Sequence, residues 1–171
     1  MVKSFLRRHL PSLAMFLVIL LSLEWWQARN MTKGQLPIDL LQGRFPTLTS
    51  DSRELWSKDQ LTLLYVFAPW CGVCRISASN INSLATDKIM VHALALSWQT
   101  QADVEEFVEE TEMQTPVILG PDFMSDSLGL SAFPSYYLIN ESGEVIKTWT
   151  GYTTQPSLWL RTRIAQLLLH F

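Results

Sequence analysis

The sequence predicts an α/β protein in which helices cover a central mixed sheet. Three observations lead to this prediction: short apolar runs rich in β-branched and aromatic residues, amphipathic stretches between them, and a regular alternation of the two. The 171 residues are enough for one domain and an appendage. No internal repeat or low-complexity tract interrupts the pattern.

The N-terminal stretch differs from the rest of the chain. Three basic residues within the first eight precede a largely apolar stretch at residues 10–26. Its continuous apolar part is shorter than about 20 residues, so a cleaved signal peptide competes with a membrane span, and a buried core helix is a third possibility. No small-residue cleavage site follows, and Trp25 and Trp26 are typical of a membrane interface. We therefore expect residues 1–29 to form a cytoplasmic tip and an uncleaved signal-anchor helix, with the following chain exported.

The part expected to be exported is acidic. Residues 30–171 hold nine Lys and Arg against fifteen Asp and Glu, a net charge of −6, and six of these acids lie in Asp103–Glu112. Because Val104, Phe107 and Val108 recur there at helical spacing, we interpret the acids as the solvated face of a helix rather than as a site for a basic partner. The chain has no basic patch, which argues against nucleic-acid binding.

The domain itself is expected at residues 35–171, after a polar linker at residues 30–34. It begins with two short extended pieces around Gln42-Gly43, which suggest a small hairpin. Residues 60–69, "QLTLLYVFAP", predict a buried strand because β-branched and aromatic residues form a short apolar run that a proline closes. The spacing of small and apolar residues then becomes helical over residues 71–85.

The second half of the domain continues the alternation. The same criteria that predict the first strand predict a second central strand in "IMVHALALS", and a glycine marks a tight turn between two later strands. The expected elements are a strand at 89–97, a helix at 102–112, an extended piece at 115–120, a helical turn at 125–130, strands at 134–140 and 145–151 joined at Ser142-Gly143, and a helix at 158–169.

Both cysteines of the chain lie in "FAPWCGVCR", where the first predicted strand meets the first helix. A structural zinc site needs four ligands, and none of His9, His92 and His170 is placed to complete one with Cys71 and Cys74. Two thiolates alone can hold Cu(I), so copper binding stays an alternative. A purely structural disulfide would close too short a loop to stabilise the fold much.

Redox chemistry fits the placement of the cysteines better. A strand that leads directly into a helix puts Cys71 at the helix N-terminus, where free N–H groups and the helix dipole favour an anion. The thiol pKa of Cys71 should therefore fall, and the thiolate is the nucleophile in disulfide exchange. Cys74 follows one turn later, where burial should raise its pKa, and it can resolve a mixed disulfide. Pro69 and Trp70 would shape the approach surface.

Two segments carry a resemblance to a known family. "LLYVFAPWCGVCR" resembles the active-site strand and helix of the thioredoxin superfamily, and "SAFPSYYLINESGEVIKTWTGY" resembles its later half. The resemblance covers residues 35–171 and implies a thioredoxin-like three-layer α/β/α fold with no cofactor and no metal. With the anchor, the chain resembles the membrane-anchored bacterial branch, which includes the cytochrome c maturation reductases and, more similar, the protein of the copper-sensitivity suppressor system.

The resemblance also implies the roles of five residues. Cys71 would be the attacking thiol and Cys74 the resolving thiol, while Pro134 would be a cis-proline facing them, with an ordinary trans-proline as the alternative. Trp70 and Phe133 would bind the substrate, because the Phe133 backbone could pair with a substrate strand and align the target disulfide.

Two positions depart from the family pattern. Thioredoxins carry a buried acid six residues before the first cysteine, where this chain has Tyr65. The cytochrome maturation reductases often carry a glutamate three residues after the second cysteine, where this chain has Ser77. We therefore expect water or the Tyr65 hydroxyl to handle the proton of Cys74, unless Tyr65 is only a core residue.

These observations lead to a functional prediction. We expect a periplasmic thiol–disulfide oxidoreductase, anchored in a bacterial inner membrane, that exchanges disulfides with protein substrates as a reductase and is recharged by a membrane electron-transfer protein. The alternatives are a disulfide oxidase or isomerase and a Cu(I)-binding copper-tolerance protein that uses the same two thiols.

Overall fold

The computed structural model describes residues 31–169 and, before them, residues 10, 15, 16, 18, 19 and 22. The signal-anchor helix expected at residues 10–26 therefore lies mostly outside the described residues. Within the part of the chain that is described, no helix is both long enough and apolar enough to cross a membrane.

The domain is built on one mixed sheet. Among the described residues, six strands cross it in the order β1-β8-β7-β4-β5-β6. β4 pairs in parallel with β5 and antiparallel with β7, so the first apolar run predicted as a strand lies at the centre. Every residue of β4 is buried, because both faces of the sheet are covered. The strands are β1 Gly34–Gln35, β4 Leu61–Phe67, β5 Ile89–Ala95, β6 Val117–Leu119, β7 Ser135–Ile139 and β8 Glu144–Thr150.

Side chains alternate between the two faces of β4, and each face has its own hydrophobic core. Tyr65 and Phe67 belong to the core that also holds Cys74, whereas Leu64 and Val66 belong to the core on the opposite face. Helices α3, α4 and α6 contribute to the first core, and α2 and α5 contribute to the second. The architecture therefore has the α/β layers around a mixed sheet that the sequence pattern predicted, in the three-layer arrangement that the resemblance implied.

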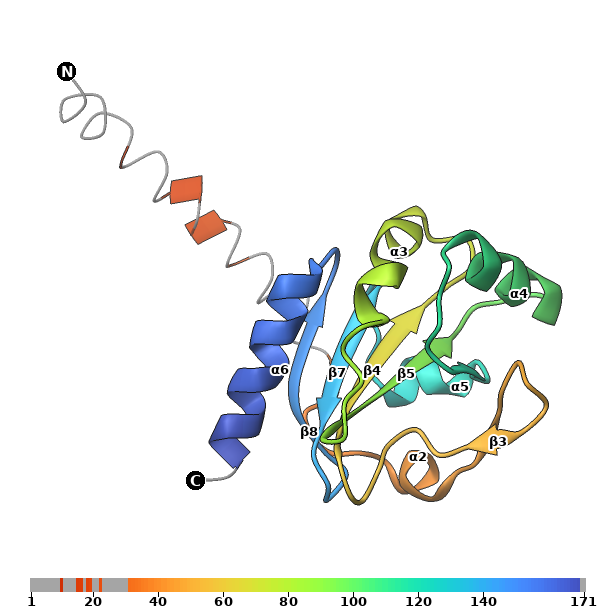
Figure 1. Ribbon diagram of the computed structural model, residues 1–171, viewed down its shortest axis with the longest axis horizontal. Coiled ribbons are helices and arrows are strands. Elements are labelled where there is room, and N and C mark those ends of the chain that lie inside the picture. The colour runs from red at the N-terminus through yellow and green to blue at the C-terminus, as the bar shows by residue number, and fades with distance from the viewer. Residues whose placement is uncertain (1–9, 11–14, 17, 20–21, 23–30, 170–171) are drawn as a thin grey trace.

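The helices match most of the expected elements. They are α2 Ile38–Gln42, α3 Gly72–Ser77 with the 3₁₀ turn η1 Ala78–Ile81, α4 Gln101–Glu110, α5 Phe123–Ser127 and α6 Gln155–Leu169. α4 begins with a capping box of Thr100 and Asp103 and buries Val104 and Phe107, so the acidic stretch is the amphipathic helix that we expected. Figure 1 shows α6 alongside β8, on the opposite side of the molecule from β3.

The hairpin predicted around Gln42-Gly43 is wrong. The residues before Gly43 form the short helix α2, which follows Pro37 and buries Leu40, and Gly43 itself is extended. Periodicity cannot separate strand from helix in so short an apolar run. Gly43 is needed for a close approach instead of a turn, because a Cβ there would collide with the Phe45 ring and the Asp39 carbonyl.

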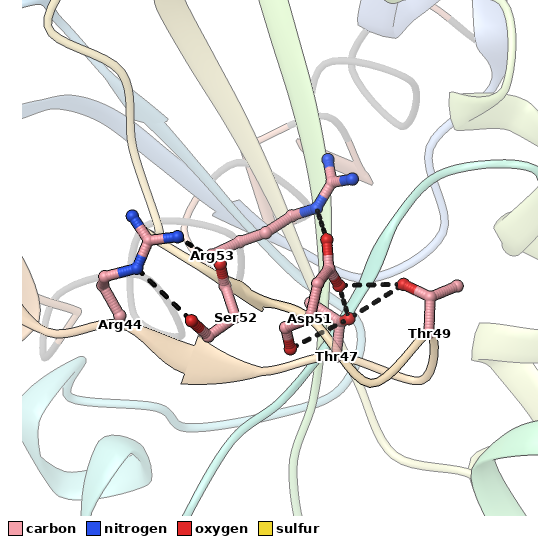
Figure 2. Close-up of polar contacts among 6 residues, drawn as sticks. All are labelled: Arg44, Thr47, Thr49, Asp51, Ser52 and Arg53. Carbon is pink, nitrogen blue, oxygen red and sulfur yellow. Dashed lines mark hydrogen bonds and ion pairs between the residues drawn. The ribbon is translucent and has the colours of Figure 1, made fainter.

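A real hairpin follows a few residues later. β2 Phe45–Pro46 pairs antiparallel with β3 Ser52–Arg53. Figure 2 shows the Asp51 carboxylate turned toward the hydroxyls of Thr47 and Thr49 on one side and the guanidinium of Arg53 on the other. The hydroxyl of Thr47, followed by that of Thr49, lowers the pKa of Asp51 to about 2. These contacts hold the turn with side chains instead of with a glycine.

The packed chain starts before the domain boundary that we expected. Met31 is buried in the core on the α2 face, and the backbone N–H of Thr32 donates to the carbonyl of Leu128 at 2.9 Å. Residues 31 and 32 of the expected linker thus contact the domain directly.

Candidate active site

The two cysteines lie at the end of β4 and form a disulfide, with 5.2 Å between their Cα atoms. Cys71 is the N-cap residue of α3, as its position between strand and helix predicted, and its Sγ accepts a 3.1 Å hydrogen bond from the backbone N–H of Cys74. Cys71 keeps 7% of its surface exposed, whereas Cys74 is completely buried. An incoming thiolate therefore meets Cys71 first.

The helix that carries the pair is shorter than predicted. α3 ends at Ser77 and continues only as the 3₁₀ turn η1, and Ala85 is exposed. The Ser77 hydroxyl donates back to the carbonyls of Val73 at 3.0 Å or Cys74 at 3.2 Å, which weakens regular helix at this point. The shorter helix still keeps Cys74 one turn below Cys71.

Trp70 and Phe133, the two residues expected to bind substrate, contact each other. Their rings meet edge to face with 5.6 Å between centroids. Trp70 is 67% exposed, and its indole N–H donates to the carbonyl of Ser97 at 2.9 Å. Ser97 has a positive φ of 53°, in the loop that follows β5. An exposed aromatic surface, fixed by this bond, thus lies next to Cys71.

Pro134 follows a cis peptide bond to Phe133 and is buried. Its neighbour Ser135 pairs with Val66, so Pro134 lies beside the end of β4 that leads to the cysteines. The carbonyl of Pro134 accepts a 2.8 Å hydrogen bond from the N–H of Gly151. The structure therefore groups all five predicted site residues around the end of β4.

Tyr65 and Ser77, which stand where related families carry acids, lie under the disulfide. Both are completely buried, and their hydroxyl oxygens are 3.2 Å apart. The Tyr65 hydroxyl donates to the carbonyl of Cys74 at 3.1 Å, so Tyr65 does more than fill the core. Burial raises the pKa of Tyr65 above its usual range, which keeps the hydroxyl protonated. Among the residues that the structure describes, no Asp or Glu is buried.

Sequence reasoning missed Arg75, which ties three parts of the site together. Its guanidinium forms an ion pair with Glu110 of α4, lies 5.5 Å from the Phe107 ring centroid, and donates to the carbonyl of Pro69 at 3.1 Å. Local patterns could identify Arg75 as a surface residue of α3, but its partner on α4 follows only from the packing of the two helices.

A small depression lies beside this arginine. It has a volume of about 290 Å³ and includes Trp70, Arg75, Trp98, Asp103 and Glu106 in its lining. The depression extends the exposed surface of Trp70 toward the acidic face of α4.

The described residues contain no cluster of three or more His, Cys, Asp or Glu side chains that could hold a metal ion. His92 is buried, which lowers its pKa. It pairs with Leu64 in the sheet and so lies on the face opposite to Cys74. His92 is therefore not a partner of the cysteine pair.

Comparison with known proteins points to one family. The family model described as Redoxin matches residues 45–161. A "Thioredoxin-like protein" of Haemophilus influenzae is 26% identical over 168 residues, which cover 96% of this chain and 97% of that protein. "Sporulation thiol-disulfide oxidoreductase A" of Bacillus subtilis is 22% identical over 153 residues, which cover 85% of this chain and 93% of that protein.

Solved structures show the same fold. StoA from Bacillus subtilis superposes with a TM-score of 0.63 at 24% identity, covering 70% of this chain and 95% of StoA. A secreted Mycobacterium tuberculosis disulfide oxidoreductase, homologous to E. coli DsbE, superposes with a TM-score of 0.64 at 16% identity, covering 75% of this chain and 99% of that one. These similarities confirm the thioredoxin-like α/β fold with a central mixed sheet.

Proposed function

The chain belongs to the Redoxin family and is a thiol–disulfide oxidoreductase, and we propose that it reduces disulfides of protein substrates through Cys71 and Cys74. The observation that carries this proposal is the unequal exposure of the two sulfurs. A substrate can reach Cys71 at the start of α3, whereas Cys74 is buried one turn below and can reach only Cys71.

The proposed reaction has two exchange steps. In the reduced protein, the thiolate of Cys71 attacks a substrate disulfide, forms a mixed disulfide with one substrate sulfur and releases the other as a thiolate. Cys74 then loses its proton and attacks Cys71, which releases the second substrate sulfur and leaves the Cys71–Cys74 disulfide. Two electrons pass from the cysteine pair to the substrate, and the released thiolates take up protons from solvent.

We assign substrate binding to Trp70 and Phe133, and we assign to Pro134 the place beside the reacting sulfurs. The contact between the Trp70 and Phe133 rings supports this assignment, because it forms one exposed aromatic surface next to Cys71. A substrate segment lying in extended conformation along the Phe133 backbone would add main-chain hydrogen bonds.

We further propose that the domain works in the periplasm, held to the inner membrane by residues 10–26 and reduced again by a membrane electron-transfer protein. The basic residues before this stretch and the interfacial tryptophans after it support the orientation. Residues 30–171, the part that would be exported, carry a net charge of −6.

Trapping of mixed disulfides tests the proposed roles. Cys74→Ala should accumulate mixed disulfides with protein substrates, because no thiol is left to resolve them, while Cys71→Ala should accumulate few. If the Cys71→Ala variant is the better trap, the roles are reversed. If neither variant traps and the wild type binds Cu(I) without turning over a disulfide, the protein is a copper-binding protein instead.

The reduction potential tests the direction of the reaction. A potential near the thioredoxin value of about −270 mV supports a reductase, whereas one near about −120 mV identifies an oxidase. The potential is measured by equilibrating the purified domain with redox buffers and counting free thiols.

A further inference from the structure

The last helix of the domain turns large apolar side chains outward. Along α6, four of them recur at the spacing i, i+4, i+7 and i+8, which places them on one side of the helix. Between 48% and 72% of the surface of each is exposed, and they are Leu160, Ile164, Leu167 and Leu168. We call this set the α6 stripe.

The side of α6 that packs on the sheet has a different composition. Leu158 is buried there, but the next two positions on this side are Thr162 and Gln166, which are 1% and 9% exposed. A surface helix of a globular protein normally buries its large apolar residues and exposes its polar ones. Because packing within the domain leaves the α6 stripe uncovered, the stripe indicates a contact with something outside the domain.

The charges on α6 suit an anionic surface. The helix has two arginines and no Asp or Glu, whereas residues 30–171 as a whole carry a net charge of −6. Helical spacing puts Arg161 at one edge of the stripe and Arg163 at the other. The guanidinium of Arg161 lies 5.2 Å from the Trp149 ring centroid, and that of Arg163 lies 5.8 Å from the Trp159 ring centroid. An apolar stripe between basic residues, with a tryptophan beside it, is typical of helices that lie in the headgroup region of a membrane.

The chain between the proposed anchor and the domain is short. The apolar stretch ends at Trp26, and Met31 is already buried in the core of the domain. The five residue steps between them span at most roughly 18 Å, because an extended chain advances by no more than about 3.6 Å per residue. An anchored domain therefore stays against the bilayer, and part of its surface faces the lipid.

Strand order places α6 at the same edge of the sheet as the start of the packed chain. β1, which begins three residues after Met31, is the edge strand and pairs with β8. Figure 1 shows α6 alongside β8, at the outside of the molecule. The contact of Arg161 with Trp149 joins α6 and β8 directly. The α6 stripe is thus an exposed apolar surface at the edge where the domain would be tied to the membrane.

We propose that the α6 stripe lies in the headgroup region of the membrane that holds the anchor, with Arg161 and Arg163 at the level of the anionic phosphates. The proposal rests on the proposed membrane anchorage and adds which face of the domain meets the lipid. A stripe of four side chains binds weakly by itself, but the anchor keeps it at a high local concentration next to the bilayer.

This arrangement would also orient the active site. Figure 1 shows that α6 begins at the end of the molecule where α3 lies, and Cys71 is the N-cap residue of α3. With α6 lying along the bilayer, the end of the domain that carries Cys71 faces along the membrane surface and not away from it. A membrane electron-transfer protein could then reach Cys71 without release of the domain from the lipid.

The disulfide makes a labelling test possible. Cys71 and Cys74 are the only cysteines of the chain and are bonded to each other, so Leu167→Cys introduces the only free thiol of the oxidised protein. This thiol is labelled with a nitroxide in the full chain, which is then reconstituted into vesicles of phosphatidylcholine and phosphatidylglycerol. Electron paramagnetic resonance measures collisions of the label with oxygen, which concentrates in lipid, and with a nickel chelate, which stays in water. The label at position 167 should lose its collisions with the chelate and gain collisions with oxygen.

Phe123→Cys provides the matched control label. Phe123 is also an exposed apolar residue, but it lies on α5, which covers the opposite face of the sheet. Its label should stay in contact with the chelate in the same vesicles. Leu160→Glu, which puts an acid into the stripe, should return the label at position 167 to water, whereas Phe123→Glu should not.

The lipid charge tests the part assigned to the arginines. Arg163→Gln should lower the ratio of docked to undocked domain about fivefold in vesicles that contain phosphatidylglycerol, which is the usual contribution of one basic side chain at an anionic surface. The same substitution should change this ratio little in vesicles of phosphatidylcholine alone, because no anionic headgroup is then present.

The outcomes separate this proposal from the proposed anchorage. If the full chain floats with the vesicles and the label at position 167 meets the chelate as often as the label at position 123, docking is overturned while the anchorage stands. Dipolar broadening between labels at position 167, independent of the lipid, would show two copies of the chain paired through α6 and would also overturn docking. If the full chain does not float with the vesicles, the anchorage itself is overturned, and docking with it. None of these measurements depends on disulfide exchange.

Discussion

The backbone N–H of Cys74 donates a 3.1 Å hydrogen bond to the Sγ of Cys71, so the reactive sulfur caps the helix that carries its partner. α3 has only six residues, and the stabilisation of a thiolate there comes from the N–H groups of its first turn. After reduction, this contact acts on Cys71 and not on the buried Cys74.

We therefore predict that the two thiols ionise separately. Cys71 should form its thiolate below the free-cysteine pKa of about 8.5, and Cys74 above it, because burial disfavours the charged form. Thiolate absorbance against pH, for the reduced wild type and Cys74→Ala, measures both. A Cys71 that ionises at or above the free-cysteine value in both proteins would refute activation by the helix terminus.

Trp70 should matter for protein substrates and not for small ones. Trp70→Ala removes both the contact with Phe133 and the hydrogen bond to Ser97, so kcat/KM for a protein disulfide should fall about 30-fold, which corresponds to about 2 kcal/mol. Trp70→Phe keeps an aromatic ring, so its kcat/KM for the protein disulfide should lie between those of the wild type and Trp70→Ala. Trp159→Ala, which alters an exposed tryptophan of α6, is the control. Equal losses for a small aromatic disulfide and a protein substrate would argue against substrate binding.

The β2–β3 hairpin should respond to acid. Thr47 and Thr49 lower the folded pKa of Asp51 from 3.8 to about 2, so ionised Asp51 stabilises the fold fully above about pH 4, and this contribution is lost as pH falls through 2. Asp51→Asn should therefore be less stable than the wild type at pH 6, and the difference should vanish near pH 2. Urea midpoints across this range measure it. Thr49→Ala should reduce the difference, and a pH-independent difference would contradict the assignment.

The N-terminal stretch predicts where the protein is found. If residues 10–26 anchor it without cleavage, the cellular protein should begin at Met1 or Val2 and fractionate with membranes. Mass spectrometry of the intact protein and carbonate extraction measure both properties. A chain lacking residues 1–29, expressed behind a cleavable export signal, should appear in the soluble fraction. A natural N-terminus near Arg29 in soluble periplasm would refute the anchor.

Local sequence was enough to predict the centre of the fold. β4 and the start of α3 were predictable because a continuous apolar run, a proline and a change to helical spacing are signals carried by adjacent residues. The burial of Cys74 followed from the same pattern. The hairpin at Gln42-Gly43 was predicted wrongly, because five residues are too few for a period of two to be distinguished from one of 3.6.

The sequence by itself thus determined where along the chain the two sulfurs lie, because Cys71 and Cys74 mark the junction between one strand and one helix. The tertiary structure decided what surrounds them. It placed Tyr65 next to Ser77 and Arg75 against Glu110, pairs that are distant in the chain. Strand order and helix packing bring such residues together, and both depend on how whole apolar faces are buried, which no local pattern of residues encodes.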